Sequence, residues 1–226
     1  MYGENNARIS NKGLITVGNG SAGLITSGTG SEVQNSGTIT VGTGSHGIYL
    51  KDGTMVQNQA SGNIVSTGTG SVGIFADNNS AAVMQITNNG NIDFSGNDSL
   101  GIYAVGTNSH IINNNLGAVI KIGNSVNASD PGIGIYSGVA GSTVTNSGTV
   151  TSGINSIGIY NNLGTVNNNG VSNIGDSGVG IYSTGGIVNL NTGSAFNMGT
   201  NGAVGVYGVY STVNNSTNLN IGNSNY

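Results

Sequence analysis

A short tetrad returns along the whole chain: a small or apolar residue, then Gly, then an aliphatic residue, then usually Tyr. Between successive tetrads lies a second landmark, usually Asn, any residue and Gly, followed by alternating apolar residues. Its glycines are 22 to 31 residues apart, a period typical of solenoids. The tetrads cover 46–49, 72–75, 100–103, 133–136, 157–160, 179–182 and 204–207, with a degenerate copy at 22–25, and the landmark glycines are Gly13, Gly37, Gly62, Gly90, Gly117, Gly148, Gly170 and Gly193, with Asn218 in the ninth place.

The composition favours short strands and tight turns over helices. Gly accounts for 42 of the 226 residues, and only 5% of the residues are charged. Strong helix formers such as Leu, Glu, Lys and Arg are scarce, whereas Ile, Val, Thr, Tyr, Asn and Ser dominate. Because Ile and Val recur at fixed places in the period, the chain can build a buried core and is unlike a disordered segment.

Three strands are expected in each period. The first follows the landmark glycine and alternates polar with apolar residues, as in 14–17, 38–41, 91–94, 149–151 and 218–221. A turn rich in Gly, Asn, Thr and Ser follows, and the tetrad then forms the second strand. The apolar residues predicted to point inward from the first strand are Ile15, Val17, Ile39, Val41, Ile64, Ile92 and Phe94, and the third strand carries Val33, Val56, Ile86, Val144, Val166 or Val213.

Strands this short, with so long a period, can pair in parallel with their own copies one coil later. The prediction is therefore an all-β parallel β-helix of about nine coils of roughly 25 residues, with residues 1–226 as one solenoid. Residues 124–131, which include Pro131 in the longest interval, are predicted to project as a loop. Seven asparagines two places before a landmark glycine should align as a hydrogen-bonded ladder, namely Asn11, Asn35, Asn88, Asn115, Asn146, Asn168 and Asn191.

The alternation of the tetrad predicts a candidate binding surface. If its first and third residues face inward, its glycine and aromatic residue face outward. The aromatic residues would then form an external ladder beside a strip of glycine, a platform suited to sugars or a partner protein. The alternative is that the rings stack only to stabilise the sheet. The ladder consists of Tyr49, Phe75, Tyr103, Tyr136, Tyr160, Tyr182 and Tyr207.

Charge and residue chemistry argue against several other functions. Four basic residues against eight acidic ones leave no positive surface for nucleic acid. No stretch reads as a signal peptide or a membrane span, and there is no Cys. A calcium-binding nonapeptide repeat would have to extend Gly185-Gly186-Ile187, and it does not.

Catalysis on a β-helix usually requires carboxylates gathered on neighbouring coils. The acidic residues available for this are Asp52, Asp77, Asp93, Asp98 and Asp130. His46 is expected at an inward tetrad position and His110 in a loop, with no partner suited to a nucleophile or metal site. An ice-binding face would need regular Thr-x-Thr pairs on the strand that follows the landmark glycine, and on that strand they occur only at 38–40 and 149–151.

With its Gly-Ile-Tyr tetrads and Asn-x-Gly-[Thr/Asn]-Ile landmarks, the chain resembles the passenger domains of large type V autotransporters, and in particular fusobacterial outer-membrane adhesins. The resemblance implies a right-handed β-helix exported by a C-terminal β-barrel and displayed at the cell surface. Such passengers attach to proteins or glycans of other bacteria or host cells.

The resemblance therefore implies that the sequence is an internal or truncated segment of a larger passenger, and a monomeric rod in its parent protein. It would touch the membrane only through a barrel outside this sequence. We expect no enzyme activity, no cofactor and no metal. The alternatives are a carbohydrate-active β-helix hydrolase or lyase and, less well supported, an ice-binding rod.

Overall fold

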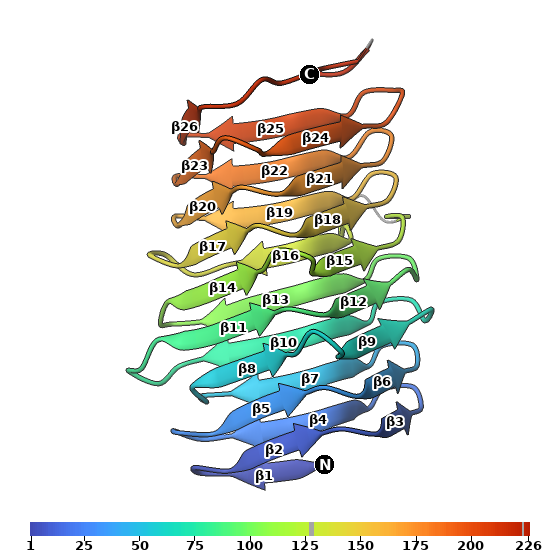
Figure 1. The fold of residues 1–226 in the computed structure, drawn as a ribbon, viewed down its shortest axis with the longest axis vertical. Coiled ribbons are helices and arrows are strands. Elements are labelled where there is room, and N and C mark those ends of the chain that lie inside the picture. The colour runs from blue at the N-terminus through green and yellow to red at the C-terminus, as the bar shows by residue number, and fades with distance from the viewer. Residues whose placement is uncertain (127–128, 223) are drawn as a thin grey trace.

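The computed structural model describes residues 1–126, 129–222 and 224–226. These residues form a parallel β-solenoid in which the chain winds through three stacked sheets from the N-terminus to the C-terminus (Figure 1). Two sheets hold nine strands and the third holds eight, which makes about eight turns of about 25 residues. The predicted all-β class with three strands per coil is confirmed. None of the described residues belongs to a helix long and apolar enough to cross a membrane.

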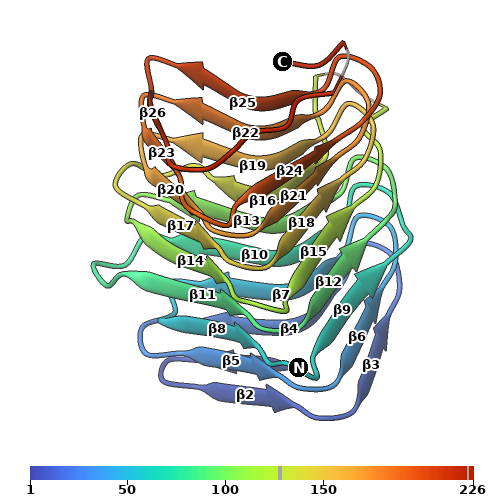
Figure 2. The same cartoon turned by 45° about the horizontal axis from the view of Figure 1, so that its top comes forward.

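Each sheet contains one strand from every coil, paired in parallel with its equivalent in the coils before and after. Figure 2 shows the three stacks as the sides of the solenoid. The first sheet consists of β1 (Tyr2–Glu4), β4 (Ala22–Ser27), β7 (His46–Lys51), β10 (Val72–Asn78), β13 (Leu100–Gly106), β16 (Ile133–Ser137), β19 (Ile157–Asn162), β22 (Val179–Thr184) and β25 (Val204–Val209).

The other two sheets contain the shorter strands of each coil. The second sheet consists of β2 (Arg8–Asn11), β5 (Glu32–Asn35), β8 (Met55–Asn58), β11 (Met84–Asn88), β14 (His110–Asn114), β17 (Thr143–Asn146), β20 (Thr165–Asn168), β23 (Ile187–Leu190) and β26 (Thr212–Asn215). The third sheet consists of β3 (Leu14–Val17), β6 (Thr38–Val41), β9 (Asn63–Ser66), β12 (Asn91–Phe94), β15 (Val119–Ile122), β18 (Thr149–Ser152), β21 (Val171–Ile174) and β24 (Ala195–Met198).

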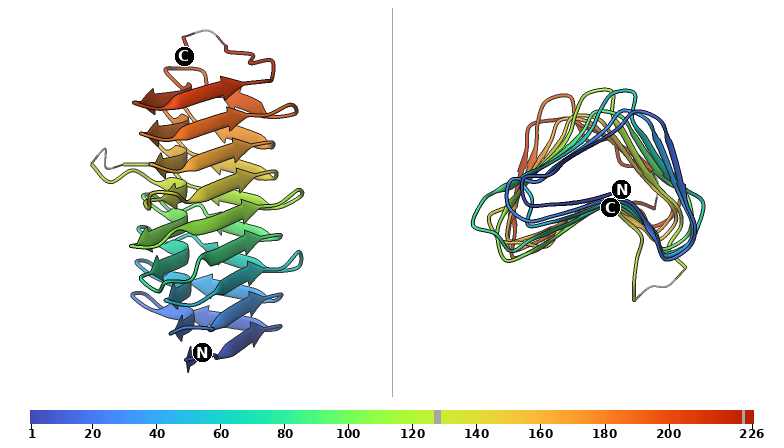
Figure 3. Two further views of the ribbon diagram at one scale, coloured as in Figure 1. Left: turned by 90° about the vertical axis from the view of Figure 1, so that its left-hand side faces the viewer. Right: turned by 90° about the horizontal axis from the view of Figure 1, so that it is seen from below.

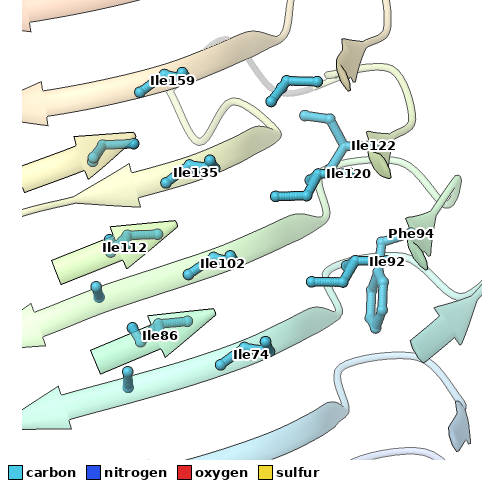
Figure 4. Packing of buried hydrophobic residues seen from close by; sticks show 14 of the residues in the cluster. Ile74, Ile86, Ile92, Phe94, Ile102, Ile112, Ile120, Ile122, Ile135 and Ile159 are labelled. Carbon is cyan, nitrogen blue, oxygen red and sulfur yellow. The ribbon is translucent and has the colours of Figure 1, made fainter. Parts of the chain in front are cut away.

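The core is a set of aliphatic columns, because each coil places the same kind of residue directly above its copy. Ile74, Ile102 and Ile135 form one column from the first sheet (Figure 4). Ile86 and Ile112 belong to the second sheet, and all five side chains are fully buried. The residues predicted to point inward from the third sheet are buried in the interior coils, whereas those of β3, at the edge of its sheet, are half-buried.

The predicted strand at 218–221 is wrong, since the third sheet ends at β24. Leu219 and Ile221 are exposed instead. The end of the tail returns to the first sheet, where the backbone N–H of Gly205 donates to the carbonyl of Tyr226 over 2.8 Å.

The predicted loop at 124–131 lies between β15 and β16, and Asn127 and Ala128 within it lie outside the described residues. Asn124 still belongs to the stack, because its side-chain oxygen accepts the backbone N–H of Ile154 over 2.9 Å. Ser125 donates its backbone N–H to the carbonyl of Ile154 over 2.8 Å. In Figure 3 the described residues next to this gap lie outside the outline of the coils. The chain is in the stack at Gly132, whose carbonyl accepts the backbone N–H of Ile157 over 2.9 Å. The projection of the whole segment stays a prediction.

A buried asparagine ladder runs along the end of the second sheet. Each side-chain amide except that of the last member, Asn168, donates to the side-chain oxygen of the next coil over 2.8 to 2.9 Å. Its members are Asn11, Asn35, Asn58, Asn88, Asn114, Asn146 and Asn168.

Two members of the predicted ladder are wrong. Asn115 and Asn191 lie one residue further along the chain and bond instead to Asn89 and Asn169, both over 2.7 Å. Leu190 occupies the ladder position in its coil. The prediction counted two residues back from the landmark glycine in every coil. The turn between the ladder position and this glycine differs in length from coil to coil, so a fixed number of residues does not lead to the same register position.

The ladder generates a prediction about stability. Asn88 accepts from Asn58 and donates to Asn114, so Asn88→Ala leaves two buried amide groups without their ladder partners. We expect a loss of about 3 kcal/mol in the free energy of unfolding, measured from urea denaturation by circular dichroism. The control is Asn113→Ala, a half-buried residue outside the ladder, which should change the stability by no more than about 0.5 kcal/mol. Equal effects of the two substitutions would contradict a structural role for the ladder.

Candidate binding surface

The seven predicted aromatic residues lie in one register column of the first sheet. Tyr103 pairs with Tyr136, Tyr136 with Tyr160, and the same register continues in both directions. We call these seven residues, Tyr49, Phe75, Tyr103, Tyr136, Tyr160, Tyr182 and Tyr207, the aromatic ladder. Six of its side chains are half-buried and Tyr207 is 50% exposed, so the column lies on the outer face of the sheet.

The rings of the aromatic ladder stack on one another. Neighbouring ring centroids are 4.7 to 5.4 Å apart. The interplanar angles are 7 to 26° except between Phe75 and Tyr103, where the angle is 41°. Offset stacking of this kind stabilises aromatic pairs beyond the area that they bury. The predicted ladder is confirmed as a structure, and the ring-to-ring stacking is also what the purely structural alternative requires.

The stacking changes what the ladder presents to a ligand. Because much of each ring face lies against its neighbour, the outer surface consists mainly of ring edges and phenolic oxygens. Burial raises the pKa of Tyr136 and of Tyr160, and the neighbouring tyrosines raise both pKa values further. These hydroxyls therefore stay protonated and can donate a hydrogen bond at neutral pH. A row of flat platforms for sugars, as the sequence predicted, is wrong for this geometry.

The predicted orientation of the first tetrad residue is also wrong in most coils. His46, Leu100, Ile157 and Val179 are half-buried rather than fully buried. The ring of His46 lies edge-on against Phe75, with centroids 5.2 Å apart, so it shares the outer face with the ladder. The first and fourth tetrad positions thus form two adjacent columns. The first is mainly aliphatic and half-buried, except for Val72 and Ile133, which are buried as predicted, and the second is aromatic.

The tetrad glycine points into the core, not outward as predicted. A Cβ atom at Gly73 would lie 2.5 Å from the carbonyl oxygen of Gly101 and 2.7 Å from Cγ2 of Ile92. The strand alternation breaks here, because the glycines are left out of the pairing register while their neighbours on both sides are paired. Glycine at the second position lets the third-position isoleucine also face inward. The exposed glycine strip therefore does not exist.

This close approach predicts the effect of a methyl group. Gly73→Ala should cost about 1–3 kcal/mol of stability, because the new Cβ meets a backbone carbonyl and a packed isoleucine. Gly13→Ala is the matched control: nothing lies within 4 Å of its Cβ position, and its φ is not positive. Thermal denaturation of the two variants provides the comparison. A Gly73→Ala variant as stable as Gly13→Ala would show that the first sheet can shift to accommodate the methyl group.

His110 belongs to strand β14 and not to a loop, which corrects the sequence prediction. It is 1% exposed, and neither ring nitrogen has a hydrogen-bond partner in the structure. Burial lowers its pKa to about 4, although the nearby carboxylate of Asp77 acts in the opposite direction. A neutral, unpartnered imidazole in the core has no geometry suited to acid–base chemistry with a substrate.

The lowered pKa of His110 predicts a pH-dependent stability. The unfolded imidazole, with a pKa near 6.5, binds a proton more tightly than the folded one. The contribution of neutral His110 to the free energy of unfolding is therefore fully present above pH 6.5 and is lost as the pH drops toward 4. The difference is up to about 3 kcal/mol. His110→Met introduces the residue type that Met84 already places in the same column, and it should flatten this part of the urea-midpoint profile. His46→Val, which introduces the residue type of its neighbour Val72, is the control and should leave more of the slope. Parallel profiles for the wild type and His110→Met would contradict the assignment.

The acidic residues serve the stack rather than a common cleft. Asp52 accepts the backbone N–H of Asn79 over 2.7 Å, and Asp98 accepts that of Val126 over 2.8 Å. Asp93 pairs with Lys121 across 3.3 Å on the third sheet. Within the described ranges no three His, Cys, Asp or Glu side chains gather so as to hold a metal ion.

A further carboxylate in this role, Asp176, was not singled out from the sequence. It accepts the backbone N–H of Thr200 over 2.6 Å, and hydrogen bonds from the coil above lower its pKa. Its position in a turn, followed by Ser177 with a positive φ, was the available signal.

The threonine pairs are too far apart to form a continuous face. Thr38 and Thr40 lie on β6, and the next strands in the third sheet carry Asn63 and Val65, then Asn91 and Asp93. Thr149 and Thr151 return only on β18. The regular threonine array that an ice-binding rod requires is therefore interrupted over three consecutive coils.

Comparison with protein-family models, curated proteins and solved structures finds no match for the chain. The geometry of the aromatic ladder and of the stack therefore carries the functional argument, and the resemblance to autotransporter passengers stays a prediction.

Proposed function

We propose that the chain is a segment of a cell-surface adhesin, a non-catalytic rod that attaches to a protein or glycan of other bacteria or host cells. The observation that carries the proposal is the aromatic ladder, which extends over seven consecutive coils on the outer face of one sheet. Aromatic side chains are enriched where proteins meet partners, because they combine apolar area with few rotatable bonds.

The stacked coils make this surface rigid and repetitive. Backbone hydrogen bonds join every coil to the next, and the buried asparagine ladder adds a second set along the same axis. A rigid array loses little conformational entropy when it binds, which favours attachment through many weak contacts. Display at the cell surface and anchoring through a C-terminal barrel of the parent protein belong to the same proposal and come from the resemblance of the repeats.

No specific observation favours a second function. The carbohydrate-active hydrolase or lyase would need converging carboxylates, and Asp52 and Asp98 are engaged by backbone N–H groups while Asp93 is paired with Lys121. The ice-binding rod would need the continuous threonine face that the third sheet lacks.

The proposal is tested by coating beads with the purified chain and counting the bacteria and epithelial cells that they retain. The test variant replaces Tyr136, Tyr160 and Tyr182 with Ile, the residue that occupies the same column at Ile25. We expect the number of retained cells to fall about tenfold. Each aromatic ring contributes roughly 1 kcal/mol to the free energy of binding, and the isoleucines keep part of this apolar contact.

The matched control is Tyr210→Asn, since Tyr210 is 96% exposed, lies outside the ladder and has a φ of 50°, which Asn tolerates and a β-branched residue does not. Circular dichroism and the thermal midpoint establish that both variants fold. A folded triple variant that retains cells as well as the wild type would overturn the role of the ladder. A wild-type chain that retains no cells above uncoated beads would overturn the adhesive function itself.

A further inference from the structure

We infer that the aromatic ladder binds a neutral, extended polysaccharide that lies parallel to the long axis of the rod, with one sugar unit for each coil. This inference rests on the proposed adhesive function and specifies its ligand. It follows from four features of the ladder: its spacing, the groups that it presents, the charge of its flanks and its width.

The first feature is the spacing. Successive rings are 4.7 to 5.4 Å apart over seven coils, because the parallel sheet beneath sets one rung for each strand. In an extended β-1,4-linked chain each pyranose advances the polymer by nearly the same distance. Such a ligand can place one sugar unit at every rung, with the same edge of the sugar returning at every second rung, whereas a partner with another period falls out of register after one or two.

The second feature is the group that each rung presents. Neighbouring rings cover much of one another's faces, so a sugar cannot lie flat on a ring as it does on an isolated aromatic side chain. What remains outward is the ring edge with its hydroxyl, which can both donate and accept a hydrogen bond. No ladder hydroxyl is hydrogen-bonded to another group in the described part of the chain. A polymer with hydroxyl groups along its edge complements this row.

The third feature is the charge of the flanks. On one side of the upper ladder lie the aliphatic first tetrad residues, such as Ile157 and Val179. On the other side lie Val105, Asn162 and Thr184, which are uncharged. Lys51 and Asp77, of opposite charge, lie beside the lower ladder and are neighbours in the register. A neutral ligand fits these flanks better than a strongly anionic or cationic one.

The fourth feature is the width. The ladder is one ring wide and most of its side chains are half-buried, so it exposes far less than the roughly 800 Å² that each partner contributes to a standard protein interface. A slender polymer can gain affinity along the length of the row instead. The geometry therefore favours a polysaccharide over a folded partner or a second copy of the rod.

The ladder also contains a natural interruption that makes the inference testable. Phe75 has no hydroxyl, so the longest unbroken run of hydroxyls has five rungs, Tyr103, Tyr136, Tyr160, Tyr182 and Tyr207. Phe75→Tyr would join Tyr49 to this run and extend it to seven rungs. Phe75 already stacks on both neighbours, so the substitution should leave the ring positions unchanged.

The experiment measures the binding of cello-oligosaccharides and N-acetyl chito-oligosaccharides of two to eight units to the full chain by isothermal titration calorimetry. Affinity should rise with length up to about five units and then level off. In Phe75→Tyr the rise should continue to about seven units. Tyr136→Phe with Tyr160→Phe keeps the stacked rings and removes two hydroxyls, and it should weaken pentamer binding about 25-fold, or about fivefold for each hydroxyl. Tyr210→Phe is the control and should bind as the wild type does.

The outcomes separate this inference from the proposed function. Binding that does not depend on length, or that Tyr136→Phe with Tyr160→Phe leaves unchanged, overturns the axial polysaccharide. Equal affinity for coiled malto-oligosaccharides overturns the match of spacing. Cell retention that is lost in the Ile variant while no oligosaccharide binds also overturns it and leaves adhesion standing. Sedimentation that shows a dimer dissociated by the two Phe substitutions would assign the ladder to a second copy of the chain instead.

Discussion

Parallel backbone pairing between coils is the interaction on which the rest of the structure depends. Each strand lies in register on its copy in the next coil, at the short distance that backbone hydrogen bonds require. Every side chain is therefore surrounded, above and below, by the residues that occupy the same position of the repeat. Isoleucine packs on isoleucine, asparagine bonds to asparagine, and tyrosine stacks on tyrosine.

This alignment satisfies the hydrogen-bonding groups of buried asparagines best when they form a continuous column. The side-chain oxygen and amide of an interior ladder asparagine such as Asn114 are both used by the adjacent coils. The column ends at Leu190, and there the amide nitrogen of Asn168 is left buried without a partner. The cost of an unpaired buried amide explains why the asparagines occur as an almost unbroken series and not singly.

The tetrad glycine couples the core to the outer surface. Its inward direction brings the first sheet against the isoleucines of the third, as at Gly73 and Ile92. The same break in alternation turns the first tetrad residue outward beside the aromatic ring, where His46 touches Phe75. The candidate binding surface is thus a consequence of how tightly the core closes at the glycine.

The repeat period, the strand-forming composition and the aromatic column could be predicted from the sequence by itself, because a solenoid brings equivalent positions together whatever the details of its turns. Tertiary structure alone decided the points where local rules compete with packing. Strict alternation predicted that the tetrad glycine faces outward. In the structure Gly73 faces inward, so close to Ile92 that a larger side chain would not fit. A fixed distance from the landmark selected Asn115, whereas the pairing register selects Asn114, because turn length varies while register does not. Stacking of the rings was one of the alternatives that the sequence left open, and the rise between strands decided it by bringing the rings face to face, with their hydroxyls outward.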